Sequence, residues 1–374
     1  MEICSRCVLD TTVPEIQFDE NGVCQYCKIH DEMEKIYPLG AEGKIKLDRI
    51  VEKIKRKGRG GEHDCIVGVS GGRDSTYTLY LAKKLGLRPL AVHFDNGWNS
   101  EIAVRNIQRA TTKLGVDLHT VVADWEEFKD LQISFLKASV PDAEVPTDWA
   151  IYSVLFKVAS EENIKYVLQG HSFRTEGTSP IGWTYMDGKY INSVQKRFGT
   201  KKITSFPIMT MPHLVYYMFV MKIKEVRPLE YVKYNQKEIN KILEKELGWE
   251  YYGGHHHEST YTHFFQSYIL PKKFNIDKRK TEYSALVRSG QMGREDAISE
   301  IRDHLYPENP ELIDYCTKKL GLSLEEFEAI MAKPPKSFGD YPTYHPLIQS
   351  TRILIRIACD FHLLPRILYL KYAL

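Results

Sequence analysis

The sequence feature that most constrains the fold is a glycine-containing turn between an apolar run and an amphipathic helical pattern. The apolar run is residues 65–69 (Cys-Ile-Val-Gly-Val), the turn is residues 70–75 (Ser-Gly-Gly-Arg-Asp-Ser), and the helical pattern continues through Leu81. A tight turn that joins a strand to a helix directs backbone N–H groups and the positive end of the helix dipole at one point. The turn therefore predicts a polyphosphate site at the end of a strand.

Further apolar runs alternate with amphipathic stretches after this turn. The runs are residues 89–94, 118–122 and 166–169, and a helical stretch begins at about Glu101. Strands that alternate with helices form parallel βαβ units, and their sheet is covered on both faces. We therefore expect an α/β fold with a doubly wound parallel sheet.

Three other regions carry local expectations. The charged segment from about 31 to 62 is expected to be one helix leading into the next domain. Residues 172–205 lack periodicity and are expected to form a long loop beside the strand ends. Beyond Pro228 the chain reads as helical, with a helix over 235–247 that ends at Gly248.

Side chains of the turn indicate how it would hold phosphate. Gly71, Gly72 and Ser75 are assigned to the phosphates, and Ser70 is expected to add a hydroxyl donor. Asp74 would repel a bare phosphate, so it implies a Mg²⁺ ion between its carboxylate and the phosphates. The spacing excludes a Walker A loop. The alternative is a plain strand-to-helix turn with a capping side chain.

The turn resembles the pyrophosphate loop of the ATP-pyrophosphatase (PP-loop) superfamily, which includes asparagine synthetase, GMP synthetase and tRNA thiolases. The resemblance implies an adenine nucleotide alpha hydrolase-like fold, cleavage of ATP between its α and β phosphates, and transfer of AMP to an acceptor oxygen.

Ligands of parallel sheets lie at the carboxyl ends of the strands, so two further strand ends join the predicted site. His93 and Asp95 end the second strand, where the superfamily binds adenosine, and Gly170 and His171 end a later one. A plain Asn-Gly turn is the alternative for Asp95, and a structural role is the alternative for His171. Glu176 is the nearest carboxylate for acid–base work.

A second motif consists of two Cys-Xaa2-Cys pairs, Cys4 with Cys7 and Cys24 with Cys27, separated by hairpin-forming residues. Four thiolates at this spacing predict a closed tetrahedral zinc site with a structural role. His30 is interpreted as a surface residue rather than a ligand.

A third motif covers residues 253–280. Five cations fall within nine residues there, and they are expected to close over pyrophosphate as it leaves. The cations assigned to catalysis are Lys272, Lys273, Lys278 and Arg279. A solvated basic face is the alternative. Upstream, His256 and Glu258 are assigned to the acceptor, and a metal site at the three histidines 255–257 is disfavoured because adjacent side chains diverge.

These motifs together resemble the N-acetyl sugar amidotransferases over nearly the whole chain. The four-cysteine module and the turn are joined by residues 169–171 (Gln-Gly-His), 253–259, 264–266 (Phe-Phe-Gln), 272–279 and 289–295. That family is linked to bacterial surface polysaccharide, including lipopolysaccharide O-antigen, or to flagellin sugars. The resemblance implies that the acetamido oxygen of a nucleotide-linked N-acetyl sugar is adenylated and that ammonia then displaces AMP, giving an acetamidino sugar.

The source of ammonia is expected to lie outside the chain. Cys4 is committed to a pair with Cys7, and no other cysteine sits in a Gly-Xaa-Cys-Xaa-Gly nucleophile turn. We therefore expect a separate glutaminase subunit, or free ammonia from solution.

Length and charge set the remaining expectations. The 374 residues predict three parts: a zinc module (1–40), an ATP-pyrophosphatase domain (41–250) and a mainly helical region (251–374) that completes the active site. A net charge of +2 argues against a nucleic-acid partner. Without a signal pattern or an apolar run of about 18 residues, a cytoplasmic location is expected. The basic, apolar tail from Arg352 is expected to pack on the main domain, with a membrane surface or a partner as the alternative. A homo-oligomer is left open.

Two rival functions stay open. A tRNA thiolase would need reactive or cluster-binding cysteines in the central domain, whereas Cys65, Cys316 and Cys359 stand alone in the sequence. A non-catalytic zinc-ribbon adaptor that senses nucleotide would release no pyrophosphate.

Overall fold

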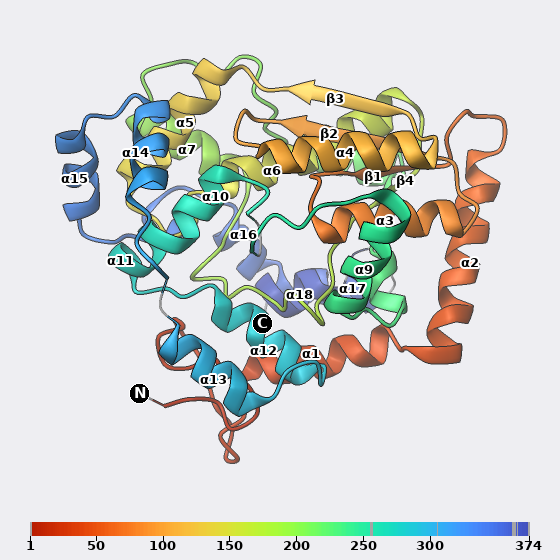
Figure 1. Ribbon diagram of the computed structural model, residues 1–374, viewed down its shortest axis with the longest axis horizontal. Helices are drawn as coiled ribbons and strands as arrows, with labels where there is room; N and C mark the ends of the chain where they lie inside the picture. The colour runs from red at the N-terminus through yellow and green to blue at the C-terminus, as the bar shows by residue number, and fades with distance from the viewer. Residues whose placement is uncertain (1, 255–256, 305, 361–363, 365, 373–374) are drawn as a thin grey trace.

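A computed structural model describes residues 2–254, 257–304, 306–360, 364 and 366–372 (Figure 1). Its centre is a five-stranded sheet in the order β3-β2-β1-β4-β5, and every pair is parallel. The strands are β1 (Cys65–Gly68), β2 (Pro89–Asp95), β3 (Leu118–Val122), β4 (Tyr166–Leu168) and β5 (Lys224–Val226). This confirms the predicted doubly wound α/β fold.

The middle strand β1 lies where the order of the sheet reverses. Its register pairs Ile66 with Leu90 on one side and with Val167 on the other. The chain builds β2 and β3 outward from one edge of β1 and later returns to place β4 along the other edge. A crevice forms at such a switch point outside the carboxyl ends of the strands. The glycine turn follows β1 and therefore opens into this crevice.

Helices cover the two faces of the sheet with separate apolar cores. One core packs α2 (Gly40–Gly58), α3 (Arg73–Lys84), α4 (Glu101–Leu114) and α9 (Gln236–Leu247), and the α3 and α4 ribbons run side by side in Figure 1. The other core includes α5 (Trp125–Ala138), α6 (Val145–Glu161) and α7 (Gly188–Phe198). The predicted helix 235–247 is confirmed: Asn235 caps its start and Gly248, at φ +66°, ends it.

Two local expectations were wrong. Residues 31–62 form parts of two helices, α1 (Gln25–Ile36) and α2, because Pro38 lacks an N–H and disfavours helical geometry at Tyr37. The predicted loop 172–205 contains α7, which Asp187 caps and which buries Tyr190 and Ile191. Its apolar face is too short to stand out from the polar sequence around it.

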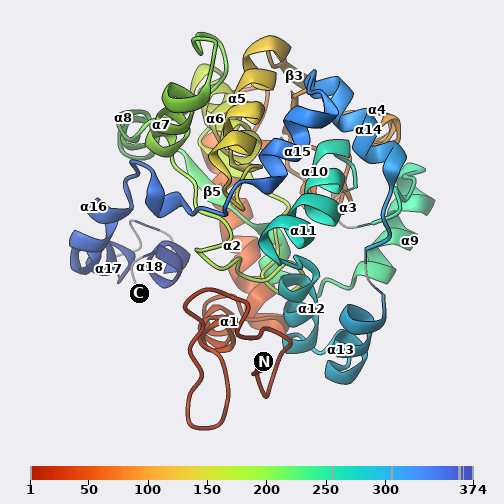
Figure 2. The same cartoon turned by 90° about the vertical axis from the view of Figure 1, so that its left-hand side faces the viewer.

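The C-terminal part is mainly helical, as expected. Its longer helices are α12 (Arg279–Arg288), α13 (Arg294–Asp303), α14 (Pro310–Leu320), α15 (Leu324–Ala332) and α17 (Arg352–Asp360). The shorter helices of the chain are α8 (Met211–Val215), α10 (Thr260–Phe264), α11 (Leu270–Phe274), α16 (His345–Ser350) and α18 (Arg366–Tyr372). Both views place α1 beside α12 and α13 (Figures 1 and 2). Within the described residues, no helix has the length and apolarity needed to cross a bilayer.

Candidate active site and metal centre

The turn after β1 has a backbone that only glycine allows. Gly71 adopts φ +77°, and a Cβ there would collide with the backbone carbonyl of Ala103 in α4. Gly170, at the end of β4, is equally tight, because a Cβ there would lie 2.6 Å from the carbonyl carbon of Asp74. The ends of β1 and β4 are therefore packed closely by backbone atoms alone, with no room for a side chain at either glycine.

Hydrogen bonds fix the direction in which the turn presents its donors. The carbonyl of Gly71 accepts from Trp249 Nε1 (3.0 Å) and from Asn106 Nδ2 (3.2 Å). In a trans peptide the following N–H points the opposite way, so the Gly72 N–H faces the concave side, 3.3 Å from Ser70 Oγ. The hydroxyls of Ser70 and Ser75 lie 3.1 Å apart. These donors converge at the N-terminus of α3, as a phosphate site requires.

A cavity of about 80 Å³ opens at this point. It is lined by Ser70, Gly72, Arg73, Asp74, Ser75, Gly170, Glu176, Tyr252 and Glu258. The structure thus gathers most of the predicted turn residues with Gly170, Glu176 and Glu258. Long-range pairing places Glu258, because its carbonyl accepts from the Ser100 N–H (2.8 Å) and Thr260 N donates to the Trp98 carbonyl (2.9 Å).

Asp74 is oriented by two neighbours. Arg73 Nε donates to its Oδ1 (2.9 Å), and the Tyr234 hydroxyl donates to the same oxygen. Tyr252 accepts from the Arg73 N–H at 3.2 Å. Burial raises the pKa of both phenols well above the ordinary value, so they stay neutral. The sequence analysis missed both tyrosines and Trp249; the only sequence signal was the aromatic residues on either side of the predicted helix 235–247.

The strand-end candidates occupy different environments. His171 Nδ1 lies 2.9 Å from Glu176 Oε2, and the Ser172 N–H donates to Glu176 Oε1 (3.3 Å), so this pair is preset beside the cavity. His93 is instead buried, with Nδ1 2.9 Å from the Val69 carbonyl, and burial lowers its pKa. Asp95 accepts from the Gly97 N–H (2.9 Å) within an Asn-Gly turn.

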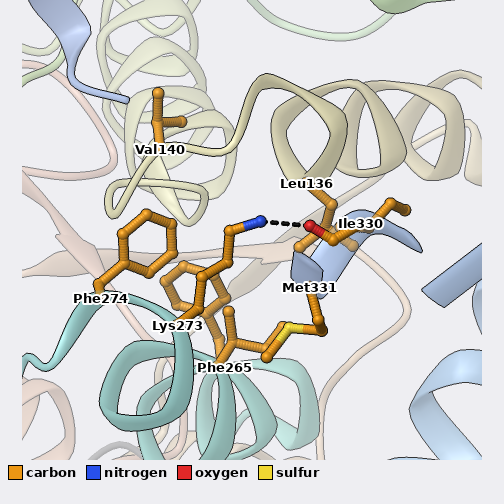
Figure 3. Close-up of a pocket in the computed structure, with 8 residues that line it drawn as sticks. Leu136, Val140, Phe265, Lys273, Phe274, Ile330 and Met331 are labelled. Atoms are coloured by element: carbon orange, nitrogen blue, oxygen red, sulfur yellow. Dashed lines mark hydrogen bonds between the residues drawn. The ribbon is translucent and has the colours of Figure 1, made fainter. Parts of the chain in front are cut away.

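The basic segment, residues 272–280, does not converge on the cavity. Lys272 pairs with Glu308 (2.6 Å) at the exposed surface. Lys273 enters an apolar pocket and donates to the Ile330 carbonyl (Figure 3), and burial lowers the pKa of Lys273 to about 8.

The other cations of the segment also have local partners. Lys278 Nζ lies 3.2 Å from the hydroxyls of Ser179 and Thr184. Arg279 pairs with Asp277 (2.6 Å). Lys280 forms a buried ion pair with Asp10 (2.6 Å) in the N-terminal module.

The histidine run is only partly placed. His255 and the predicted acceptor residue His256 lie outside the described residues. His257 stacks on His263, with ring centroids 3.7 Å apart.

The four cysteines of the N-terminal module meet in one fully buried cluster. The Sγ atoms of Cys4 and Cys27 lie 3.8 Å apart, and those of Cys7 and Cys24 lie 3.7 Å apart. A tetrahedron with metal–sulfur bonds of about 2.3 Å has edges of about 3.8 Å. The spacing therefore fits a single tetrahedral ion.

Two residues near the cluster were not predicted correctly: Arg288 was not foreseen as a contact, and His30 was placed at the surface. Arg288 of α12 donates to Cys7 Sγ (3.2 Å) and Cys27 Sγ (3.3 Å), where its charge offsets that of the thiolates. The assignment of His30 to the surface was wrong. It is 4% exposed and packs edge-on against Phe173, because α1 is docked on the main domain.

Comparison with known proteins identifies two parts of the chain. Residues 64–152 match the model of the queuosine biosynthesis protein QueC, and residues 258–354 match the C-terminal domain of LPS biosynthesis protein WbpG-like. The first match contains the glycine turn and the first strands of the sheet, so this part of the chain is similar to a PP-loop ATPase domain, as the sequence resemblance predicted.

Individual relatives cover parts of the chain. The uncharacterized protein MJ1599 of Methanocaldococcus jannaschii is 29% identical over 45% of this chain and 58% of its own length. The GMP synthase [glutamine-hydrolyzing] of Pyrobaculum aerophilum is 33% identical over 33% of this chain and 24% of its own length. The tRNA-specific 2-thiouridylase MnmA 2 of Fusobacterium nucleatum is 25% identical over 28% and 33%. The chain therefore spans less than two thirds of each of these curated relatives.

Among solved structures, the U34-tRNA thiolase NcsA from Methanococcus maripaludis with its [4Fe-4S] cluster aligns over 86% of this chain and 99% of its own. The TM-score is 0.32 and the identity is 15%. This likeness is too distant to bear on function.

Proposed function

We propose, for a chain that joins a QueC-like PP-loop domain to a WbpG-like C-terminal domain, that the protein is an ATP-dependent amidotransferase of an N-acetylated, nucleotide-linked sugar. The acetamido oxygen attacks the α-phosphorus of ATP and pyrophosphate leaves. Ammonia then adds to the activated carbon, and AMP departs with the former amide oxygen. The products are an acetamidino sugar, AMP and pyrophosphate.

The observation that carries this proposal is the meeting of the two matched parts at one cavity. Glu258 is the first residue of the WbpG-like match, and its carboxylate lies against the phosphate turn of the QueC-like part. A Cβ placed at Gly72 would be 3.0 Å from Glu258 Oε1. An acceptor bound by the C-terminal domain would therefore meet ATP at the turn.

Phosphate and metal are assigned to different groups of the cavity. Ser70, Gly72 and Ser75 would hold the leaving pyrophosphate through hydroxyl and backbone donors. The carboxylates of Asp74, Glu176 and Glu258 would repel it, so they fit Mg²⁺, which takes oxygen ligands and would neutralise the phosphate charge.

His171, which is paired with Glu176, and Lys278 are assigned to the acceptor. The His171–Glu176 pair is placed to take up the proton that the attacking ammonia loses. Lys278, which the sequence assigned to pyrophosphate, is here assigned to acceptor contact instead, because Ser179 and Thr184 hold it beside the segment that follows β4.

The remaining partners follow from the cysteines. We assign Zn²⁺ with a structural role to the four-cysteine cluster, since all four thiolates are used and buried. Cys65 and Cys316 are fully buried and Cys359 is 4% exposed, so none offers the accessible thiolate that a glutaminase or thiolase needs. Ammonia is therefore assigned to a separate glutaminase subunit or to solution.

The test is mass spectrometry of UDP- and CMP-linked acetamido sugars after incubation with the protein, MgATP and ammonium. Conversion of oxygen to NH lowers the sugar mass by about one unit, and AMP with pyrophosphate should appear in equal amounts. ATP consumption that yields ADP and orthophosphate would contradict the proposal. Formation of thiolated tRNA, in a parallel incubation with MgATP, tRNA and a sulfide donor, would favour the thiolase.

A further inference from the structure

Arg174 joins the metal module to the wall of the cavity. It lies in the turn of residues 172–177 that follows β4, and its side chain is 4% exposed. Its guanidinium donates to both carboxylate oxygens of Glu34 at 2.7 and 2.6 Å. It also donates to the carbonyls of Tyr37 (2.6 Å) and Glu230 (2.8 Å). A bidentate, buried arginine of this kind holds its backbone in one place.

The helix that carries Glu34 also carries a metal ligand. Cys27 and Glu34 both lie in α1 and are seven residues apart, so they project from the same face of the helix. A metal ion that fixes Cys27 therefore fixes the position of Glu34. Without the ion, the four thiolates that hold the start of α1 would have no common centre.

A second route from the cluster reaches the same residue. Arg288, the last residue of α12, donates to the sulfurs of Cys7 and Cys27, and the next residue, Ser289, donates its hydroxyl to the Arg174 carbonyl (2.8 Å). Side chain and backbone of Arg174 are thus both tied to elements that contact the metal cluster.

The other end of this turn is in the candidate site. Two residues beyond Arg174, Glu176 lines the cavity and contacts His171 at 2.9 Å. The Glu176 N–H donates to the Ser172 carbonyl (2.9 Å), so the turn is a single hydrogen-bonded unit. A shift of Arg174 would move Glu176.

We propose that the four-cysteine module positions the His171–Glu176 pair, and that Arg174 is the positioning residue through which it acts. The proposal rests on the proposed function only in taking the cavity as the place of reaction. It gives the module a role beyond its own folding: the ion controls the geometry of an acid–base pair that it does not touch.

The first test is amide hydrogen exchange in the full-length protein, with and without removal of the metal by a chelator, followed by addition of Zn²⁺. Metal removal should raise exchange in residues 171–177 about tenfold or more, while β1 and β2 stay protected. Zn²⁺ should restore the original rates. Faster exchange confined to residues 2–36 would overturn the proposal.

The second test compares Arg174→Met and Glu34→Gln with a matched control, Arg6→Met. Arg6 makes an equally bidentate pair with Asp31 of the same helix α1 (2.7 and 2.8 Å), but that pair does not reach the turn. Arg174→Met and Glu34→Gln should raise exchange at 171–177 and slow AMP formation about tenfold or more, with the KM for ATP within about twofold of its original value. Arg6→Met should change neither.

Non-additivity separates positioning from general weakening. Once Arg174 is replaced, metal removal should add little to exchange at 171–177, and Arg174→Lys should restore part of the lost rate. Should Arg174→Met fail to fold, Glu34→Gln decides, because Glu34 is 37% exposed. Unchanged amide exchange at residues 171–177 in Glu34→Gln would contradict the proposal. If the original protein forms no AMP with any acceptor tried, the proposed function fails, but the exchange result still decides the coupling.

Discussion

The phosphate turn and the basic segment of residues 272–280 are built on opposite principles. In the turn, backbone groups carry the interactions. Because Gly71 and Gly170 have no side chain, they lie directly against the backbone of neighbouring segments. In the basic segment, side chains carry the interactions, and each cation has a different partner: an exposed carboxylate for Lys272, a carbonyl in an apolar pocket for Lys273, and a buried carboxylate for Lys280. Backbone geometry therefore holds the donors of the turn together. Charges that are neighbours in the sequence are instead directed to different partners by the fold.

The largest expected effect on activity comes from Gly71→Ala. A methyl group would meet the Ala103 carbonyl at a φ of +77°, so we expect a loss of about 2–4 kcal/mol in unfolding free energy and a fall of at least about 100-fold in AMP formation. Denaturant unfolding and an AMP assay measure the two effects.

Gly290→Ala is the matched control for that change. Gly290 also has a positive φ of +71°, but nothing lies within 4 Å of its added Cβ, so only the backbone cost of about 1 kcal/mol is expected. Equal costs at both positions would show that the close approach at Gly71 is unimportant.

The next effect concerns the buried pair. Lys280→Met leaves Asp10, 3% exposed, without its cation, and should lower the unfolding free energy by about 3–5 kcal/mol. The measurement is denaturant unfolding near neutral pH. Retained binding of MgATP by the folded fraction is expected, since Lys280 does not line the cavity. Loss of nucleotide binding at full stability would instead assign this cation to the site.

Lys273→Met tests the apolar pocket. The pKa of Lys273 is about 8 in the folded state and higher when unfolded, so the folded state holds a charge at a cost below pH 8, and the wild type gains stability as pH rises from about 8 to 10.5. Methionine removes that cost but also the hydrogen bond to the Ile330 carbonyl, so it should flatten this pH dependence, with a net change within about 1 kcal/mol at pH 7. A large loss of turnover with stability intact would instead assign Lys273 to catalysis.

The smallest effect is expected for Lys272→Ala. Its ion pair with Glu308 is exposed and screened by solvent, so the unfolding free energy should not change measurably. Thermal unfolding of Lys272→Ala and Lys280→Met under the same conditions compares their stability costs directly. A cost near that of Lys280 would mean that position in the segment, rather than burial, sets the energetics.

Local sequence was enough for the fold and for most of the residues that line the candidate site. The strand–turn–helix order around residues 65–81 predicted the parallel sheet and the glycine turn at its carboxyl edge, and the cysteine spacing predicted the buried four-cysteine cluster. Asn235 and Gly248 marked the ends of α9. In each case the information lies within a few residues, because caps, glycine turns and metal-ligand pairs are local.

Tertiary structure alone decided which distant side chains contact the turn and connect it to the cysteine module. Sequence did not reveal that Glu258 would pair beside Ser100 and reach the turn, that Tyr234 would orient Asp74, or that Arg174 would connect Glu34 to the cavity wall. Such contacts join residues more than a hundred positions apart, and they depend on the exact docking of helices on the sheet. The chemistry of the turn is written in adjacent residues, whereas the environment of each distant side chain is set by packing.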